Sequence, residues 1–421
     1  MRGRIIFLVL QIVFFASWCE GYNVPHNDPL SNLSGDLTNS PSDNTIKKSM
    51  FEETGVLGNE NNDKISNIFN VSTEYKKNKE LIDDGIDVVF CTDKAYAIPT
   101  IITIYSILKN STTSKYNFHI FVPSNFSDEQ KMYFNNLKNI DNVRDFSISF
   151  YHIGNRFNGL STGWRLATPC YYRFCIPFIL GDKKKVIYLD SDLLVRKDLS
   201  EFFNIDISNE YLAAVTDCSF NPQDGIKIQI NDKEVRLTKY FNSGVLLLNC
   251  EKIREDNLKD TFSGLLDYHK ERPFNFLDQD ILNIACNNNV KIVSPKFNFV
   301  INSYYGGMIA PYEKTIYAEK YNVSGEDFNS AREDASVVHF TRPKPWNSYG
   351  NKHENEWFET YLNDPYGSLQ NSTSFCNFTS DEDKKTKLED WIKIPANYYN
   401  EYKTLEEELI KINIIPQNWD S

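Results

Sequence analysis

The stretch Y-L-D-S-D-L-L-V, residues 188–195, decides the fold of this 421-residue chain. The apolar run 186–189 predicts a buried strand, and two carboxylates, Asp190 and Asp192, follow at its end. Two oxygen donors held by a rigid strand suit a hard divalent cation such as Mn²⁺ or Mg²⁺ that also binds phosphate oxygens. An isolated D-x-D pair also occurs simply as a solvated turn after a strand, so the surrounding sequence has to distinguish these interpretations.

The sequence around this strand alternates between strand-like and helix-like segments. Apolar residues behind Pro99 recur at helical spacing, and Ser127 with Gln130 forms a capping box for the next helix. Strands alternating with helices predict an α/β fold, in which a Rossmann-like mixed, mostly parallel sheet is flanked by helices. The strands are expected at 88–91, 118–122, 146–150, 186–189, 244–248 and 337–340, later helices near 171–179, 253–269 and 278–286, and a hairpin near 231–232.

The two ends of the chain differ from this central part. Two arginines precede an apolar run at 5–18, so residues 1–21 are expected to be a secretory signal peptide or a short anchor. Residues 22–82 are Asn-rich and lack a sustained apolar period, which predicts a disordered, low-complexity stem. The folded domain is expected over 83–350, and 351–421 is expected to be a peripheral C-terminal extension.

The composition excludes some functional classes and favours one compartment. With 45 basic and 57 acidic residues, the formal net charge is −12, which gives nucleic-acid binding no general electrostatic basis. The sequence contains no C-x-x-C pair, the spacing that would indicate a structural zinc site. N-x-S/T sites, usable only in a secretory lumen, occur at Asn32, Asn70, Asn110, Asn125, Asn322, Asn371 and Asn377. We therefore expect the protein in the lumen of the secretory pathway, in the endoplasmic reticulum or Golgi, or secreted.

Two further stretches place polar groups at the ends of predicted elements. V-V-H-F-T-R-P-K-P-W, residues 337–346, supplies an imidazole at His339 that could bind a metal, and an ammonium at Lys344 that could meet phosphate. L-D-Q-D-I-L-N, residues 277–283, crowds acids at the start of a helix. Each stretch also has a purely structural interpretation, since histidines are often buried and hydrogen-bonded, and helix dipoles favour acids at their first turn.

In combination these motifs resemble glycosyltransferase family 8, the retaining GT-A enzymes that include bacterial lipooligosaccharide galactosyltransferases and glycogenin. The resemblance covers most of the predicted folded domain, from about residue 87 to residue 346. It rests on V-F-C-T-D-K-A-Y at 89–96, Arg173, Y-L-D-S-D-L-L-V at 188–195, F-N-S-G-V-L-L-L-N at 241–249, L-D-Q-D-I-L-N at 277–283 and H-F-T-R-P-K-P-W at 339–346. It implies a GT-A fold and a UDP-sugar donor.

The resemblance also implies roles for individual residues. The Mn²⁺ or Mg²⁺ ion would be held by Asp190, Asp192 and His339, with the donor phosphates completing its shell. The uridine would contact Asp93 and Tyr96, and Lys344 would contact the diphosphate. The transferred sugar would be surrounded by Arg173, Asn242, Ser243, Asp278 and Gln279, of which Arg173, Asp278 and Gln279 are the candidate catalytic residues.

The family retains the anomeric configuration, yet its pattern shows no obvious carboxylate nucleophile. We therefore favour a front-face attack, in which the leaving phosphate helps to deprotonate the acceptor hydroxyl, over a glycosyl-enzyme intermediate. The expected reaction moves a hexose (galactose or glucose) or xylose from a UDP-sugar to a glycan, glycoprotein or glycolipid. Two alternatives are a non-catalytic lumenal sugar-binding protein and a D-x-D phosphatase with Asp190 as nucleophile. The sequence does not indicate an oligomeric state.

Overall fold

A computed structural model describes residues 69, 84–112, 114–143, 145–154, 156–162, 168–217, 225–231, 233–302, 323–342, 344–346 and 397–419. The predicted signal peptide, nearly all of the predicted stem, and residues 351–396 lie outside these ranges. Of the N-x-S/T sites, Asn110 and Asn125 lie within them. In the described part of the chain, no helix has the length and apolar character needed to cross a membrane.

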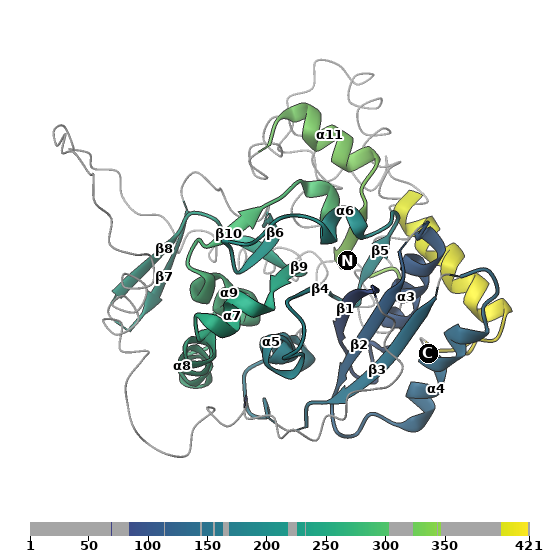
Figure 1. Cartoon of the computed structure of the whole chain (residues 1–421), viewed down its shortest axis with the longest axis horizontal. Coiled ribbons are helices and arrows are strands. Elements are labelled where there is room, and N and C mark those ends of the chain that lie inside the picture. The colour runs from purple at the N-terminus through teal and green to yellow at the C-terminus, as the bar shows by residue number, and fades with distance from the viewer. Residues whose placement is uncertain are drawn as a thin grey trace, which may run out of the picture. The chain divides into compact units, whose positions relative to one another are not determined.

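A seven-stranded mixed sheet forms the centre of the fold (Figure 1). Its strand order is β10-β6-β9-β4-β1-β2-β3, and β9 runs antiparallel to both of its neighbours, whereas the other pairs are parallel. The sheet is therefore mostly parallel, as the sequence predicted. Its strands are β1 (Ile86–Cys91), β2 (Tyr116–Val122), β3 (Phe146–His152), β4 (Lys185–Leu189), β6 (Leu212–Thr216), β9 (Phe241–Asn249) and β10 (Val290–Ile292).

Helices pack on both faces of this sheet. The side chains of its strands point alternately to the two faces and belong to two separate apolar clusters, each of which includes helices. In β1, Val88 and Phe90 belong to one cluster, while Val89 and Cys91 belong to the other. The first cluster includes α3 (Ala97–Asn110), α4 (Asp128–Asn136), η2 (Leu137–Asn139), α6 (Ser200–Phe203), η4 (Pro295–Phe297) and α11 (Gly325–Glu333). The second includes η3 (Thr168–Cys175), α5 (Ile176–Ile179), α7 (Cys250–Glu255), α8 (Leu258–Glu271) and α9 (Leu277–Cys286).

Two smaller sheets complete the described strands. β11 (Phe299–Asn302), β12 (Val337–Arg342) and β5 (Leu193–Val195) form a three-stranded sheet in the order β11-β12-β5. β7 (Ile226–Ile230) and β8 (Lys233–Leu237) form the hairpin expected near 231–232, and Asn231 adopts a left-handed φ of 55° at its turn. The three-stranded sheet is important for the site because β5 directly follows Asp192.

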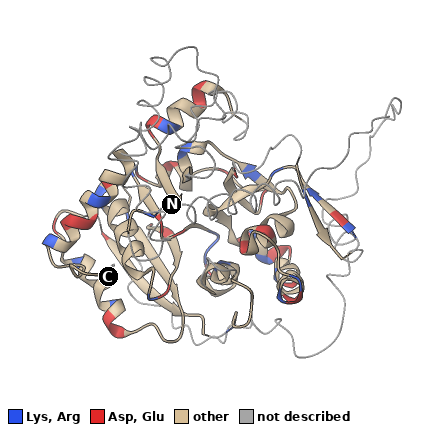
Figure 2. Ribbon diagram, turned by 180° about the vertical axis from the view of Figure 1, so that it is seen from behind, with Lys and Arg blue, Asp and Glu red and all other residues tan. Residues whose placement is uncertain are grey.

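Some elements differ from the sequence-based expectations in detail. The helix predicted near 253–269 is two helices, α7 and α8, separated at Asn257, which has a left-handed φ of 52°. The segment near 171–179 is mostly a 3₁₀ helix, with only residues 176–179 α-helical. The capping box of Ser127 and Gln130 is present at the start of α4. Basic and acidic side chains are interspersed along the described helices (Figure 2).

Residues 397–411 form a further helix, drawn in yellow in Figure 1. Its side chains Tyr398, Tyr402 and Leu409 are at most 2% exposed and belong to the same apolar cluster as α3 and β12. This described part of the predicted C-terminal extension therefore packs on the core of the domain.

Candidate active site

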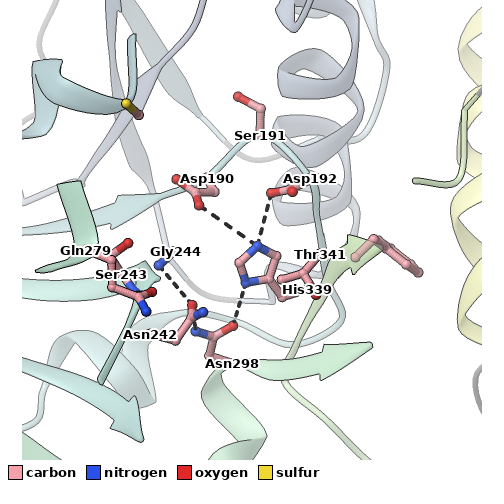
Figure 3. Close-up of polar contacts among 12 residues, drawn as sticks. Asp190, Ser191, Asp192, Asn242, Ser243, Gly244, Gln279, Asn298, His339 and Thr341 are labelled. Carbon is pink, nitrogen blue, oxygen red and sulfur yellow. Dashed lines mark hydrogen bonds and ion pairs between the residues drawn. The ribbon is translucent and has the colours of Figure 1, made fainter. Parts of the chain in front are cut away.

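The D-x-D pair lies where β4 ends and β5 begins. The backbone N–H of Asp190 donates to the carbonyl of Gly244 on β9 at 2.8 Å, which continues the β4–β9 pairing one residue beyond the strand. The intervening Ser191 faces away from the two acids, as Figure 3 shows. Its hydroxyl oxygen accepts from the hydroxyl of Thr100 on α3 at 2.8 Å. Helix α3 thus anchors the turn that presents Asp190 and Asp192.

His339 reaches the two aspartates because β12 pairs with β5. In this antiparallel pair His339 lies opposite Leu193, and the N–H of Phe340 donates to the carbonyl of Asp192 at 3.0 Å. The His339 Nε2 atom lies 3.2 Å from Asp192 Oδ1 and 3.9 Å from Asp190 Oδ2 (Figure 3). We call these three residues, Asp190, Asp192 and His339, the metal cluster.

Asn298 fixes the orientation of the His339 ring. This fully buried residue precedes β11, and its Oδ1 lies 3.0 Å from His339 Nδ1. Its amide nitrogen donates to Asn242 Oδ1 at 2.8 Å, so the Asn298 oxygen is the atom that faces the imidazole. An acceptor at this position favours the tautomer with the proton on Nδ1, which leaves the Nε2 lone pair directed toward the aspartates.

Gly244 allows β9 to pass close to the metal cluster. A Cβ atom at this position would lie 2.3 Å from His339 Cε1 and 2.9 Å from Asp190 Oδ2, both far below van der Waals contact. A side chain here would displace two of the three cluster residues. The glycine in the stretch 241–249 therefore has a packing reason in this structure.

The Lys344 ammonium group completes the charge arrangement on the β12 side. It forms an ion pair with the Asp192 carboxylate and donates to the carbonyl of Phe340 at 3.0 Å. Burial by itself would raise the pKa of Asp192, but the positive charge of Lys344 and the contact with His339 outweigh it and lower that pKa. Asp192 is therefore a carboxylate at neutral pH, as a metal ligand must be.

Arg173 connects the metal cluster with the start of α9. Its guanidinium lies 3.0 Å from Asp190 Oδ1 and 3.1 Å from Asp278 Oδ2, and it also donates to the carbonyl of Ser243 at 2.7 Å. The same group stacks over the ring of Tyr188, whose hydroxyl donates to Asp190. Burial raises the pKa of Asp278, and the charge of Arg173 opposes that rise. Arg173 thus holds two carboxylates in fixed positions.

Gln279 and Asn242 form a second polar group beside Ser243. The N–H of Ser243 donates to Gln279 Oε1 at 3.0 Å, and Gln279 Nε2 donates to Asp217 Oδ2 at 3.0 Å. Asn242 Nδ2 donates to the same Asp217 oxygen at 3.3 Å. Asn242 also accepts from Asn298, which contacts His339 (Figure 3). Because Asp217 accepts from both Asn242 and Gln279, a continuous hydrogen-bonded path joins His339 to Gln279.

The two residues predicted to contact uridine lie between β1 and α3. Asp93 Oδ1 accepts from the N–H groups of Ala95 and Tyr96 at 2.9 and 3.2 Å, so the carboxylate holds the turn before α3. The ring of Tyr96 packs edge-on against Trp346, with centroids 5.9 Å apart. Because Trp346 is two residues after Lys344, the uridine-side and phosphate-side segments are in direct contact.

The residues of the metal cluster fit a hard divalent cation. One ligand atom from each of the three residues lies within 4.8 Å of the others, which is close enough for a single ion to bridge them. Two carboxylate oxygens and one imidazole nitrogen are suitable donors for Mn²⁺, and carboxylates are also the ligands of Mg²⁺. The Asn298 contact supplies the outer-shell hydrogen bond that a ligating histidine normally makes.

The structure brings all predicted site residues into one connected region, while their individual roles stay predictions. Three residues that hold the predicted ones in place were not identified from the sequence: Asn298, Asp217 and Tyr188. Tyr188 lies within the quoted D-x-D stretch, where its position in the strand was the only signal. Asn298 and Asp217 are single polar residues next to strands, and no local pattern distinguishes them.

The mixed α/β fold is that of the GT-A class, and the metal cluster lies at the end of its strand β4. Residues 87–350, more than half of the chain, match the family described as Glycosyl transferase family 8. The chain therefore belongs to that family. The D-x-D phosphatase alternative, which left His339 and Lys344 without a role, receives no support from this match.

Three similar proteins illustrate the relationship. A putative glycosyltransferase of Haemophilus influenzae is 32% identical over 222 residues, covering 51% of this chain and 63% of that protein. The lipopolysaccharide 1,2-glucosyltransferase of Escherichia coli is 26% identical, covering 66% and 78%. The solved bifunctional glycosyltransferase WbbM has a TM-score of 0.51 at 23% identity, covering 63% and 48%, and shows the fold alone. The chain spans somewhat less than two thirds of the first of these relatives.

Proposed function

We propose that this protein is a metal-dependent, retaining glycosyltransferase that moves a hexose (galactose or glucose) or xylose from a UDP-sugar to a glycan, glycoprotein or glycolipid. The observation that carries the proposal is the metal cluster with Lys344 beside it. A metal site next to a fixed ammonium group suits a diphosphate, since both neutralise phosphate charge. Family membership supports the reaction class.

The residues at the phosphate end have separable tasks. Asp190, Asp192 and His339 would hold Mn²⁺ or Mg²⁺, which when bound supplies positive charge against the charge that develops on UDP. Lys344 is positioned by the Phe340 carbonyl, and its ion pair with Asp192 keeps it charged although burial opposes this. Fixed charges of this kind need no reorganisation when the sugar–phosphate bond breaks.

The residues at the sugar end supply orientation. Arg173 pairs with Asp278 and Asp190 and thus holds the sugar side at a fixed distance from the metal cluster. Gln279 is held by Ser243 and Asp217, so its amide has a defined direction. A glutamine is not a nucleophilic carboxylate, which supports a front-face attack in which a leaving-phosphate oxygen accepts the proton of the acceptor hydroxyl. A covalent sugar trapped on Gln279 or Asp278 would contradict this mechanism.

We place the reaction in the lumen of the secretory pathway. The support for this proposal is the signal-like segment 1–21 together with the N-x-S/T sites. Two of the similar bacterial proteins are described as a lipopolysaccharide glucosyltransferase and a lipopolysaccharide galactosyltransferase. Because both transfer a hexose, they support a hexose donor in preference to xylose.

A donor panel tests the proposed function. Purified protein is incubated with several UDP-sugars, with Mn²⁺ or with EDTA, and released UDP is measured beside the double variant Asp190→Asn, Asp192→Asn. We expect Mn²⁺-dependent release from one UDP-sugar that is absent in the double variant. If no UDP-sugar is hydrolysed or bound, the enzyme assignment is wrong, and a non-catalytic sugar-binding protein of the same fold becomes the better interpretation.

A further inference from the structure

The helix at 397–411, which we call the C-terminal helix, lies outside the range that matches the family. It nevertheless contributes buried residues to the apolar cluster on the α3 side of the sheet. Two of these, Tyr402 and Leu409, are 0% exposed. The C-terminal helix is therefore an integral part of the core next to the candidate site.

Polar contacts fix the position of the C-terminal helix along α3 and β5. Glu408 accepts from the hydroxyl of Tyr105 at 3.0 Å and forms an ion pair with Lys109 at 2.5 Å, both on α3. Glu401 pairs with Arg196, directly after β5, at 2.7 Å. Such partly exposed pairs add little free energy, but they connect the C-terminal helix with both α3 and the residue that follows β5.

The residue that faces the site is Tyr402. Its ring contacts Trp346 at a centroid distance of 5.8 Å and Phe340 at 5.6 Å. Trp419 also contacts Trp346, with ring centroids 6.4 Å apart, and its indole N–H donates to Glu406 Oε1 at 2.9 Å. Trp346 is 0% exposed, so these rings, together with Tyr96, enclose it.

We propose that the C-terminal helix positions Lys344 for the donor diphosphate, and that the Tyr402 ring is the principal positioning residue. The inference rests on the proposed function for its ligand. Lys344 lies between Phe340 and Trp346 in the sequence, and Tyr402 contacts both of these side chains. Without this support the segment loses its apolar contacts on one side, and the Lys344 ammonium loses its fixed position beside Asp192.

The aromatic ring of Tyr402, and not its hydroxyl, carries this role. The hydroxyl oxygen is buried and has no hydrogen-bond partner among the described residues. Burying an unsatisfied hydroxyl costs free energy, so removing it should leave the packing intact and should not lower stability. Tyr402→Phe is therefore a conservative variant that should retain the function, whereas Tyr402→Ala should lose it.

The test measures UDP binding in the presence of Mn²⁺ by calorimetry and amide hydrogen exchange of peptides that cover Lys344 and Trp346. If the unsupported segment holds its binding position about one-tenth of the time, Tyr402→Ala raises the Kd for UDP about tenfold. Exchange in those peptides increases in the same variant without any ligand. Tyr402→Phe behaves like the wild type in both measurements.

A matched control separates positioning from general destabilisation. Phe134→Ala removes a fully buried aromatic ring from α4, where it packs on Phe126 and Phe150. It should lower stability without changing UDP affinity or exchange at Lys344. If Tyr402→Ala does not fold, Tyr402→Leu replaces it.

The possible results separate the two proposals. The positioning role is overturned if the Tyr402 variant that folds shows the same exchange at Lys344 and Trp346 as Phe134→Ala. If the wild type binds no UDP, the proposed function fails, but the exchange comparison still decides whether the C-terminal helix holds this segment.

Discussion

Replacement of Gly244 by alanine should disable the metal cluster while leaving the fold intact. The new Cβ would lie 2.3 Å from His339 Cε1, whereas carbon atoms come to rest at about 3.5 Å, so the imidazole or β9 must retreat by about 1.2 Å. Overpacking of this kind costs about 1–3 kcal/mol of stability. A misplacement of about 1 Å in a catalytic arrangement costs on the order of 100-fold in rate.

The assay for Gly244→Ala combines Mn²⁺ binding, followed by electron paramagnetic resonance, with thermal unfolding and UDP release. We expect Mn²⁺ affinity and UDP release to fall together, with a folded protein by circular dichroism. Gly325→Ala is the matched control, because a Cβ at this first position of α11 meets no atom within 4 Å. Wild-type Mn²⁺ affinity in Gly244→Ala would refute the close approach of β9 to His339.

Three further predictions address other parts of the structure. Asn298→Ala removes the acceptor for His339 Nδ1 and should weaken Mn²⁺ binding about 10- to 100-fold, as measured by electron paramagnetic resonance. Asn298→Asp keeps an acceptor and should lose less Mn²⁺ affinity. Equal losses in both variants would contradict the orienting role of Asn298. Burial raises the pKa of Asp280 from 3.8 to about 6, so the folded chain binds this proton more tightly than the unfolded chain does. The free energy of unfolding should therefore fall by up to about 3 kcal/mol as the pH rises from 3.8 to about 6. Urea unfolding across that range should show a smaller fall in Asp280→Asn, and an unchanged fall would count against the shift. When the protein is expressed through a secretory pathway, peptide mass spectrometry should find a glycan on the exposed Asn125 and none on Asn110. The amide nitrogen of Asn110 already donates to two backbone carbonyls, at 3.1 and 2.9 Å. A glycan on Asn110 would be inconsistent with this structure.

The sequence predicted the parts of the fold that local patterns encode. The apolar strand before Asp190 and the alternation of strands and helices were sufficient for the mixed sheet, and the capping box at Ser127 was found where expected. The break between α7 and α8 at Asp256 and Asn257 was not predicted, because buried apolar residues such as Ile253 and Leu258 lie on both sides of it.

The motifs of the site could be predicted from the sequence, but the residues that hold the motif side chains in place could not. His339 and Lys344 could be connected with the D-x-D pair only through the family pattern, since the β5–β12 pairing that joins them spans more than 140 residues. Asn298 and the packing role of Gly244 depend on how three strands approach one another, which no local spacing reveals. The contribution of Tyr402 depends on the tertiary packing of a helix within 351–421, a segment that was expected to be a peripheral extension.

The central claim is that Asp190, Asp192 and His339 form a metal site that binds the diphosphate of a nucleotide-sugar together with Lys344. The most direct test is a calorimetric titration of UDP into the protein with Mn²⁺ and, separately, with EDTA. We predict that binding is strong with Mn²⁺, weak or undetectable with EDTA, and lost in the Asp190→Asn, Asp192→Asn variant. Equal UDP affinity in all three conditions would contradict the claim.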